Sequence, residues 1–253
     1  MSLFGVWTPL VALAATLLPL LWVKRWITEH LQLLSLRWLD DRDVALVVYF
    51  VIVLPGVVVH ELSHWLAAKL LGVKVSKFSL GPVRKGRSSK VSLGSVRVAN
   101  VDPLRGSLIG LAPLLGATVV ILGIGYWVLG IEELVQAFGS SGVEGLLGGL
   151  GQLVRVPDFW LWLYFIFAVS NAMLPSESDL AALRPLLIFL GIVAAVVLVV
   201  SGVPAIPPGV VEAVNAVAGY LASAFGLTLA VDLVFALVIL GLTLLTDRFK
   251  GRW

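Results

Sequence analysis

Long uninterrupted apolar runs constrain this chain more than any other feature. They cover residues 3–23, 44–71, 107–129, 159–174, 186–203 and 227–246. A helix of about 20 apolar residues crosses the roughly 30 Å hydrocarbon core of a bilayer. We therefore expect an all-α polytopic membrane protein with about six transmembrane helices. A β-barrel is disfavoured, because its strands would alternate apolar and polar residues and these runs do not.

The composition agrees with a membrane protein and excludes several kinds of functional site. Hydrophobic residues make up 59% of the 253 residues and charged residues only 13%, which is too apolar for a typical soluble domain. The chain has no cysteine, so disulfides, thiolate metal sites and cysteine nucleophiles are excluded. The net charge of +3 is expected to set orientation in the bilayer and gives no reason to predict nucleic-acid binding.

Two segments between the runs predict elements outside the hydrocarbon. Residues 26–39 place apolar side chains on one helical face and charged ones elsewhere, as in a helix lying in the membrane interface. Residues 73–101 contain two runs of alternating apolar and polar residues, separated by a turn-rich stretch. This pattern predicts a β-strand pair, with a bulge at Gly94-Ser95.

Three further segments predict interruptions of the helical pattern. Residues 130–157 are glycine-rich and predict a short surface helix and a loop, whereas the prolines of 175–185 predict a helix break. Residues 209–225 fit an interfacial helix, a re-entrant segment or a seventh span. We treat residues 1–253 as a single membrane-embedded domain, with a core at 44–185, the first span and interfacial helix at 1–43 and the C-terminal spans at 186–253.

The distribution of Lys and Arg predicts the orientation. With six crossings, twelve basic residues fall on the side of the strand pair and five on the other side. The positive-inside rule then places the N-terminus, the C-terminus, the strand pair and the 175–185 segment in the cytoplasm.

The motif His60-Glu61-Leu62-Ser63-His64 carries the chemistry. Residues four apart on a helix share a face, so both imidazoles can bind one ion, and Glu61 can reach a water beside that ion. With this composition an HExxH motif is expected by chance only about 0.001 times, so coincidence explains it poorly. A cluster of ordinary hydrogen bonds is the alternative, but ionisable groups inside a span are costly and usually functional.

A third ligand is needed, because a catalytic zinc typically has three protein ligands and one open position. His30 is a poor candidate, because the predicted orientation places it on the outer side, and cysteine is absent, so carboxylates are left. The histidine pair lies in the cytoplasmic part of its span, and the 159–174 run ends at Pro175 on the same side, which brings Asp179 to a similar depth. Glu177 is the competing ligand, and Asp179 could instead cap the next helix or be a solvated loop charge.

Together these features resemble the site-2 protease family of intramembrane zinc metalloproteases. The resemblance rests on the transmembrane HExxH, the basic strand pair after it and a later Asn…Pro…Asp segment, and it covers roughly residues 44–185. In that family the later segment commonly reads N-x-x-P-x-x-x-L-D-G, and here it reads N-A-M-L-P-S-E-S-D-L from Asn171 to Leu180. The Asn-to-Asp interval of eight agrees, proline is one place late, and Ser and Leu replace the family's Leu and Gly.

The resemblance implies a zinc metalloendopeptidase that hydrolyses peptide bonds within or next to transmembrane helices of membrane-protein substrates. It implies Zn²⁺ bound by His60, His64 and Asp179, with Glu61 as general base and Asn171 as a substrate contact, near the cytoplasmic face. No stretch is long enough for the PDZ or CBS domain that family members often add.

Two other functions stay open at this point. A non-proteolytic membrane binding or scaffold protein could retain the metal site, although it would have no need of Glu61. A transporter would need polar residues on several other spans, which are nearly bare. The strand pair could offer an edge to an extended substrate, seal the mouth of the site, or bring its eight nearby basic residues to anionic lipid headgroups.

Overall fold

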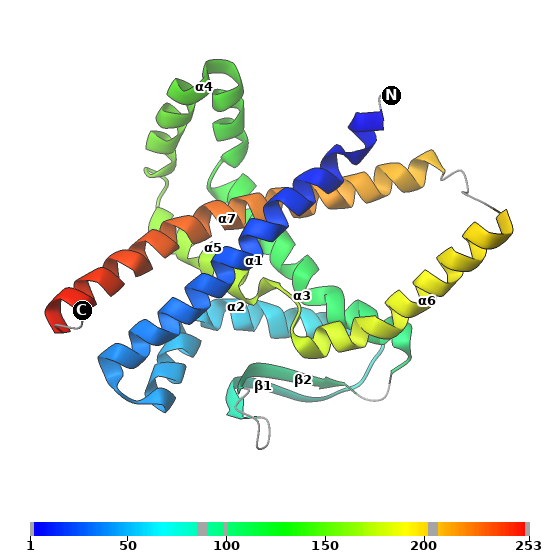
Figure 1. Cartoon of the computed structure of the whole chain (residues 1–253), viewed down its shortest axis with the longest axis horizontal. Helices are drawn as coiled ribbons and strands as arrows, with labels where there is room; N and C mark the ends of the chain where they lie inside the picture. Colours follow the sequence, from blue (N-terminus) through cyan, green and yellow to red (C-terminus); the bar gives the residue numbers. More distant parts are fainter. Residues whose placement is uncertain (1–2, 85–90, 99–100, 202–206, 251–253) are drawn as a thin grey trace.

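The computed structural model describes residues 3–84, 91–98, 101–201 and 207–250 (Figure 1). Its elements are α1 (Leu3–Leu39), α2 (Arg42–Leu70), β1 (Val75–Arg84), β2 (Val91–Val98), α3 (Pro103–Gly123) with the π-helical turn η1 (Ile124–Val128), α4 (Ile131–Leu153), α5 (Phe159–Met173), α6 (Glu177–Ser201) and α7 (Pro208–Lys250). Within these residues, five helices are long and apolar enough to cross a membrane: α1, α2, α3 with η1, α6 and α7. The predicted class, a helical membrane protein with a small strand pair, is confirmed.

The core of the protein lies where α1, α2, α3, α5 and α7 meet. Phe167 of α5 is almost fully buried and stacks on Phe235 of α7, with 4.1 Å between the ring centroids. α2 and α5 approach so closely that a Cβ at Gly56 would lie 1.9 Å from the carbonyl oxygen of Ala168. Small residues permit this kind of close backbone contact between membrane helices. The contact fixes the distance between α2, which carries the histidines, and the end of α5.

α1 and α7 run parallel to each other along much of their length. Near their C-terminal ends, Arg37 donates to Asp247 and the Trp38 indole donates to Thr246 at 3.0 Å. Further toward their N-terminal ends, Gly226 lies against Thr16. Six alternating crossings would make the first and last helices antiparallel, whereas α1 and α7 lie parallel; the placement of the chain ends relative to a bilayer stays a prediction.

The length of α5 accounts for the difference between the expected and the observed direction of α7. The prediction counted every apolar run as a complete crossing, but α5 has only 15 residues. At about 1.5 Å per residue it is roughly 22 Å long, which is less than the roughly 30 Å of a hydrocarbon core. α5 is a core helix surrounded by its neighbours, with eight of its residues buried.

The strand pair forms as predicted but its irregularity lies elsewhere. β1 and β2 are antiparallel, with Ser79 opposite Ser95 and Leu80 opposite Gly94 in regular register. The register shifts between Leu80 and Val83, where Gly81 has a φ of 132° and Pro82 cannot donate a ladder hydrogen bond. The register also shifts between Val75 and Lys77. The predicted bulge at Gly94-Ser95 is therefore wrong, and both irregularities lie on β1.

Several predicted boundaries also shift. Residues 26–39 continue α1 without a break, and residues 209–225 form the first half of α7. The predicted break at 175–185 shrinks to residues 174–176, because α6 begins at Glu177 and contains Pro185. Helices in lipid tolerate an internal proline where neighbouring groups satisfy the released carbonyl. The 130–157 segment forms α4, which has no buried residue and is kinked at Gly142.

Candidate metal centre

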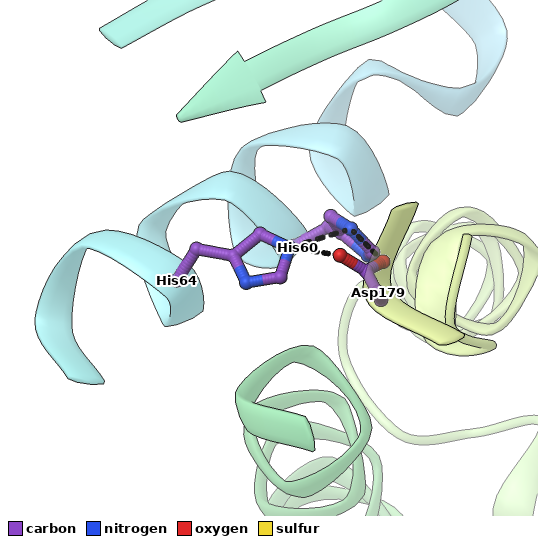
Figure 2. A group of neighbouring side chains, drawn as sticks. All are labelled: His60, His64 and Asp179. Atoms are coloured by element: carbon purple, nitrogen blue, oxygen red, sulfur yellow. Dashed lines mark hydrogen bonds and ion pairs between the residues drawn. The ribbon is translucent and has the colours of Figure 1, made fainter. Parts of the chain in front are cut away.

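Two helices bring His60, His64 and Asp179 together (Figure 2). The histidines lie one turn apart on α2, and Asp179 lies in the first turn of α6. The two Nε2 atoms are 3.2 Å apart, His64 Nε2 is 3.2 Å from Asp179 Oδ1, and His60 Nε2 is 3.5 Å from Asp179 Oδ2. All three side chains are largely shielded, with exposed fractions of 14%, 10% and 9%.

These separations suit one small divalent cation. Nitrogen and oxygen ligands of tetrahedral zinc lie 2.0–2.2 Å from the metal, so neighbouring ligand atoms are about 3.3–3.6 Å apart. The ligand atoms of the three side chains lie within 4.8 Å of one another. Across the described part of the chain, this is the group of histidine and acidic side chains that could hold a metal ion.

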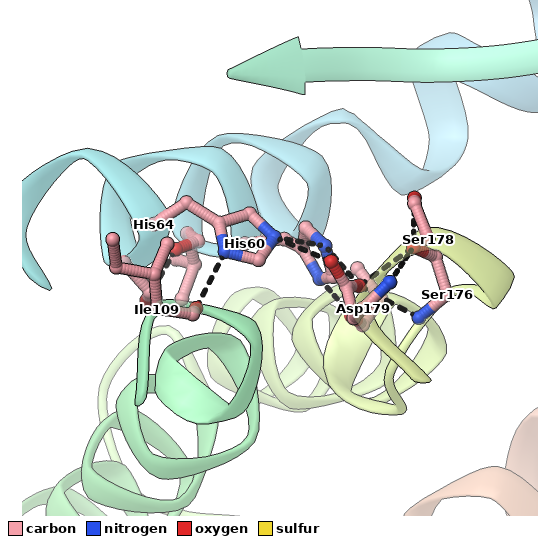
Figure 3. A network of polar contacts seen from close by, with 9 residues as sticks. His60, His64, Ile109, Ser176, Ser178 and Asp179 are labelled. Carbon is pink, nitrogen blue, oxygen red and sulfur yellow. Dashed lines mark hydrogen bonds and ion pairs between the residues drawn. The ribbon is translucent and has the colours of Figure 1, made fainter. Parts of the chain in front are cut away.

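Both imidazole rings are oriented by backbone carbonyls. His60 Nδ1 is 2.7 Å from the carbonyl oxygen of Ala172, and His64 Nδ1 is 2.8 Å from that of Ile109 (Figure 3). A carbonyl oxygen only accepts, so each Nδ1 must carry the proton and donate it. The neutral rings then direct two Nε2 lone pairs and one carboxylate at the same point. Three electron-rich groups that face one another repel each other when no positive charge lies between them. They match the ligand set of a bound cation.

A capping box at the start of α6 positions Asp179. The Ser176 backbone N–H and hydroxyl both donate to Asp179 Oδ2, at 2.7 and 2.6 Å, and the Asp179 N–H approaches the Ser176 hydroxyl at 3.4 Å (Figure 3). This is the reciprocal pattern in which a serine N-cap and the acidic residue three positions later satisfy each other's backbone donors. Asp179 is therefore not the N-cap, a place that Ser176 takes, but the third helical residue of the capping box, and it combines this role with its place beside the histidines.

α3 holds the start of α6 against α2. The fully buried hydroxyl of Ser107 donates to the carbonyl of Ala182 at 2.8 Å. A Cβ at Gly110 would lie 3.1 Å from the carbonyl oxygen of Asp179, so a larger residue would push α6 away. The same helix supplies the Ile109 carbonyl to His64. The position of α3 thus determines how closely Asp179 approaches the histidine pair.

Glu61 lies beside the group, beneath β2. Its side chain is buried, with an exposed fraction of 5%. A Cβ added at Gly94 would lie 2.6 Å from Glu61 Oε1, so the bare backbone of β2 makes room for the carboxylate. Glycine inside a strand commonly marks either a bulge or a place where the backbone comes close to another group. Gly94 is of the second kind, because it lets the backbone of β2 approach the Glu61 side chain.

A cavity of about 760 Å³ opens beside these residues. Its lining comes from four parts of the fold: α2 with His60, Glu61 and His64, β2 from Leu93 to Val98, α3 at Ile109 and Gly110, and the α5–α6 junction. A cavity of this volume can hold a short extended peptide segment and water. The three candidate ligands and Glu61 are therefore reachable from one space.

The other predicted site residues are placed differently. Asn171 does not line the cavity, and its side-chain amide donates to the carbonyl of Phe167 at 2.8 Å. Glu177, the competing ligand, lines the cavity but is exposed and stands outside the group formed by Asp179 with the histidines. The roles of Ser176 and Gly94 were not predicted, although the S-x-x-D spacing of Ser176 and Asp179 is itself a capping-box signal.

The fold and the site define a class, a helical membrane protein with a buried His-His-Asp group able to hold a divalent metal. Residues 48–94 match the family model of peptidase family M50, the site-2 protease family. The matched residues include most of α2, all of β1 and the first half of β2. The family resemblance predicted from the sequence is thereby confirmed. No curated protein and no solved structure matches the chain.

Proposed function

We propose that this protein is a zinc-dependent intramembrane endopeptidase that hydrolyses peptide bonds within or next to transmembrane helices of membrane-protein substrates. One observation carries the proposal: two imidazole nitrogens and a carboxylate converge at 3.2–3.5 Å beside a cavity that Glu61 also lines. The match to peptidase family M50 supports the same class of reaction.

His60, His64 and Asp179 would hold the zinc, with the carbonyls of Ala172 and Ile109 behind the two imidazoles. When bound there, zinc supplies Lewis-acid polarisation of the scissile carbonyl and of water. Three protein ligands leave a position for the reactants, as in catalytic zinc sites. The Ser176 hydroxyl and N–H hold the Asp179 carboxylate in place beside the two imidazoles.

Glu61 would act as the general base. It follows His60 by one residue and lines the same cavity, so its carboxylate can accept the proton of the attacking water. The same carboxyl group can then return that proton to the nitrogen of the leaving amine. Burial beneath β2 restricts the positions that the carboxylate can take, and this pre-organisation favours proton transfer.

The substrate must be extended where it is cut. The amide groups of a helix are already hydrogen-bonded to each other, so a scissile bond becomes accessible only after local unwinding. β2 lines the cavity and, among the described residues, pairs in the sheet with β1 alone, so an unwound segment could pair along its outer edge. Pairing with this edge would give grip through main-chain hydrogen bonds with little sequence specificity. Asn171 stays a predicted substrate contact.

The site would lie near the cytoplasmic face, on the side of the N-terminus. The turn between α1 and α2 is short, so α2 returns toward the side from which α1 starts, and its histidines lie in its second half. The strand pair that follows carries the exposed basic residues Lys77 and Arg97, and exposed Lys74 directly precedes it. The positive-inside rule favours the cytoplasm for such a segment.

Metal removal tests the proposed activity. The purified chain in bilayers should cleave a peptide with one transmembrane helix, lose this activity after chelation, and regain it on addition of zinc, as followed by mass spectrometry of the products. Magnesium, which prefers six oxygen ligands, should not restore activity and serves as the control. Reversible zinc binding without any cleavage of several such peptides would favour the non-proteolytic membrane scaffold instead.

Replacing Gly94 by alanine should lower cleavage without unfolding the protein. The new Cβ would overlap the Glu61 carboxylate, the mobile end of a side chain, so the carboxylate would move while the fold persists. A displacement of about 1 Å at a reacting group can cost about 10²-fold in kcat/KM. Gly106→Ala is the matched control, because Gly106 also lines the cavity but its Cβ would meet only Val101, at 3.5 Å. Equal activity of the two variants would contradict the placement of Glu61.

A further inference from the structure

We propose that Pro113 of α3 is a positioning residue for His64, because it leaves the Ile109 carbonyl available to accept the Nδ1 proton. The inference rests on the proposed zinc site. It explains why the ring of one proposed ligand, His64, is oriented as it is. It concerns a proline on a helix that contributes no side chain to the metal group.

The spacing of the two residues carries the argument. In an α-helix the carbonyl of residue i accepts from the N–H of residue i+4, and that partner of Ile109 is Pro113. Proline has no N–H, so the helix cannot supply this hydrogen bond. Ile109 and Pro113 are both buried. His64 Nδ1 lies 2.8 Å from this oxygen and takes the place of the helix donor.

The second histidine shows the same principle at another helix. His60 Nδ1 lies 2.7 Å from the carbonyl of Ala172, near the end of α5. The residue three positions on is Pro175, which has no N–H, and the residue four positions on is Ser176, whose N–H donates to Asp179 Oδ2 at 2.7 Å. Each imidazole thus donates to a carbonyl that lacks its usual helical partner. At Ala172 the end of α5 leaves the carbonyl without its helical partner, whereas at Ile109 the proline at position 113 removes that partner.

The consequence for the site is a fixed tautomer. A strong acceptor at Nδ1 keeps the proton there and the lone pair on Nε2, the atom that faces the other two candidate ligands. An amino acid with an N–H at position 113 would donate to the Ile109 carbonyl along the helix, and the oxygen would then share its two lone pairs between that donor and His64, which weakens the hold on the Nδ1 proton. Loss of such an outer partner typically lowers metal affinity 10–100-fold.

The test compares Pro113→Ala and Pro113→Val with Pro19→Ala in the full-length protein. Alanine and valine both restore the N–H, and valine keeps more of the buried volume. Pro19 is another proline inside a long helix, and it is exposed on α1. Nitrogen-15 NMR of labelled histidine in the metal-free protein would report the tautomer of each ring, and a competition titration would report zinc affinity.

Both Pro113 variants should shift His64 away from the Nδ1–H tautomer and lower zinc affinity about tenfold or more. His60, which donates to a different carbonyl, should keep its tautomer as an internal reference, and Pro19→Ala should change neither quantity. The proposal is overturned if His64 and the zinc affinity are unchanged, if only one of the two variants has an effect, or if both histidines shift together. These readouts do not depend on cleavage, so failure of the proposed protease activity would leave them intact.

Discussion

Replacing Glu61 by glutamine should lower kcat/KM for a transmembrane substrate by about 10²–10⁴-fold while zinc stays bound. Glutamine keeps the size and most of the hydrogen-bonding shape of the buried side chain, so the protein should fold normally. It cannot accept a proton at neutral pH, and the proposed general base is therefore lost. Activity is followed by the rate of product formation, and zinc content by elemental analysis of the same sample.

Glu177→Gln is the matched control for this variant. Glu177 lines the same cavity but is exposed and lies outside the proposed machinery. Its loss of charge should leave the cleavage rate within about twofold, a change equivalent to about 0.4 kcal/mol in the barrier. Normal cleavage by Glu61→Gln, with zinc in place, would exclude Glu61 as the base and with it the mechanism proposed here.

Replacing Asp179 by alanine should produce the largest loss of zinc affinity among the single variants. The substitution removes one of the three proposed zinc ligands. Two histidines remain, and catalytic zinc sites typically have three protein ligands. The decrease should exceed the 10–100-fold typical of outer partners. A competition titration with a chromogenic chelator measures the affinity, and the cleavage rate at saturating zinc measures what activity remains.

Ser176→Ala separates the ligand role of Asp179 from its capping role. This variant removes the hydroxyl that donates to Asp179 Oδ2 but keeps the carboxylate. Loss of a serine N-cap typically costs about 1 kcal/mol of stability, and its effect on zinc should stay in the range of an outer partner. Asp179→Ala with unchanged zinc affinity would refute the third-ligand assignment, and equal effects of the two variants would assign Asp179 to the cap alone.

The group around the histidines could be anticipated from spacing. The i, i+4 separation of His60 and His64 dictates a shared helix face, and the end of the apolar run before Pro175 brings Asp179 to the same depth. The structure brings these three side chains together. Exclusion of cysteine left only carboxylates for the third position, and the buried geometry favours Asp179 over Glu177 because the capping box turns Asp179 inward.

The features that were missed depend on contacts between segments distant in sequence. Gly94 was predicted to form part of a bulge, and only the position of β2 over Glu61 shows that it serves a close backbone approach instead. Pro113 can be seen in the sequence, but its proposed role depends on a contact between distant segments. That contact is the one between His64 and the carbonyl of Ile109, four residues before the proline. The parallel arrangement of α1 and α7 was missed because apolar runs do not reveal which of them cross completely.

The central claim is that His60, His64 and Asp179 together bind a single zinc ion. Zinc K-edge X-ray absorption of the zinc-loaded protein tests it most directly, with Asp179→Ala measured in parallel. We predict one zinc per chain, with two imidazole nitrogens and oxygen ligands at about 2.0–2.2 Å, and a changed or lost spectrum in the variant. A spectrum with one or no imidazole, or one that Asp179→Ala leaves unchanged, would contradict the account.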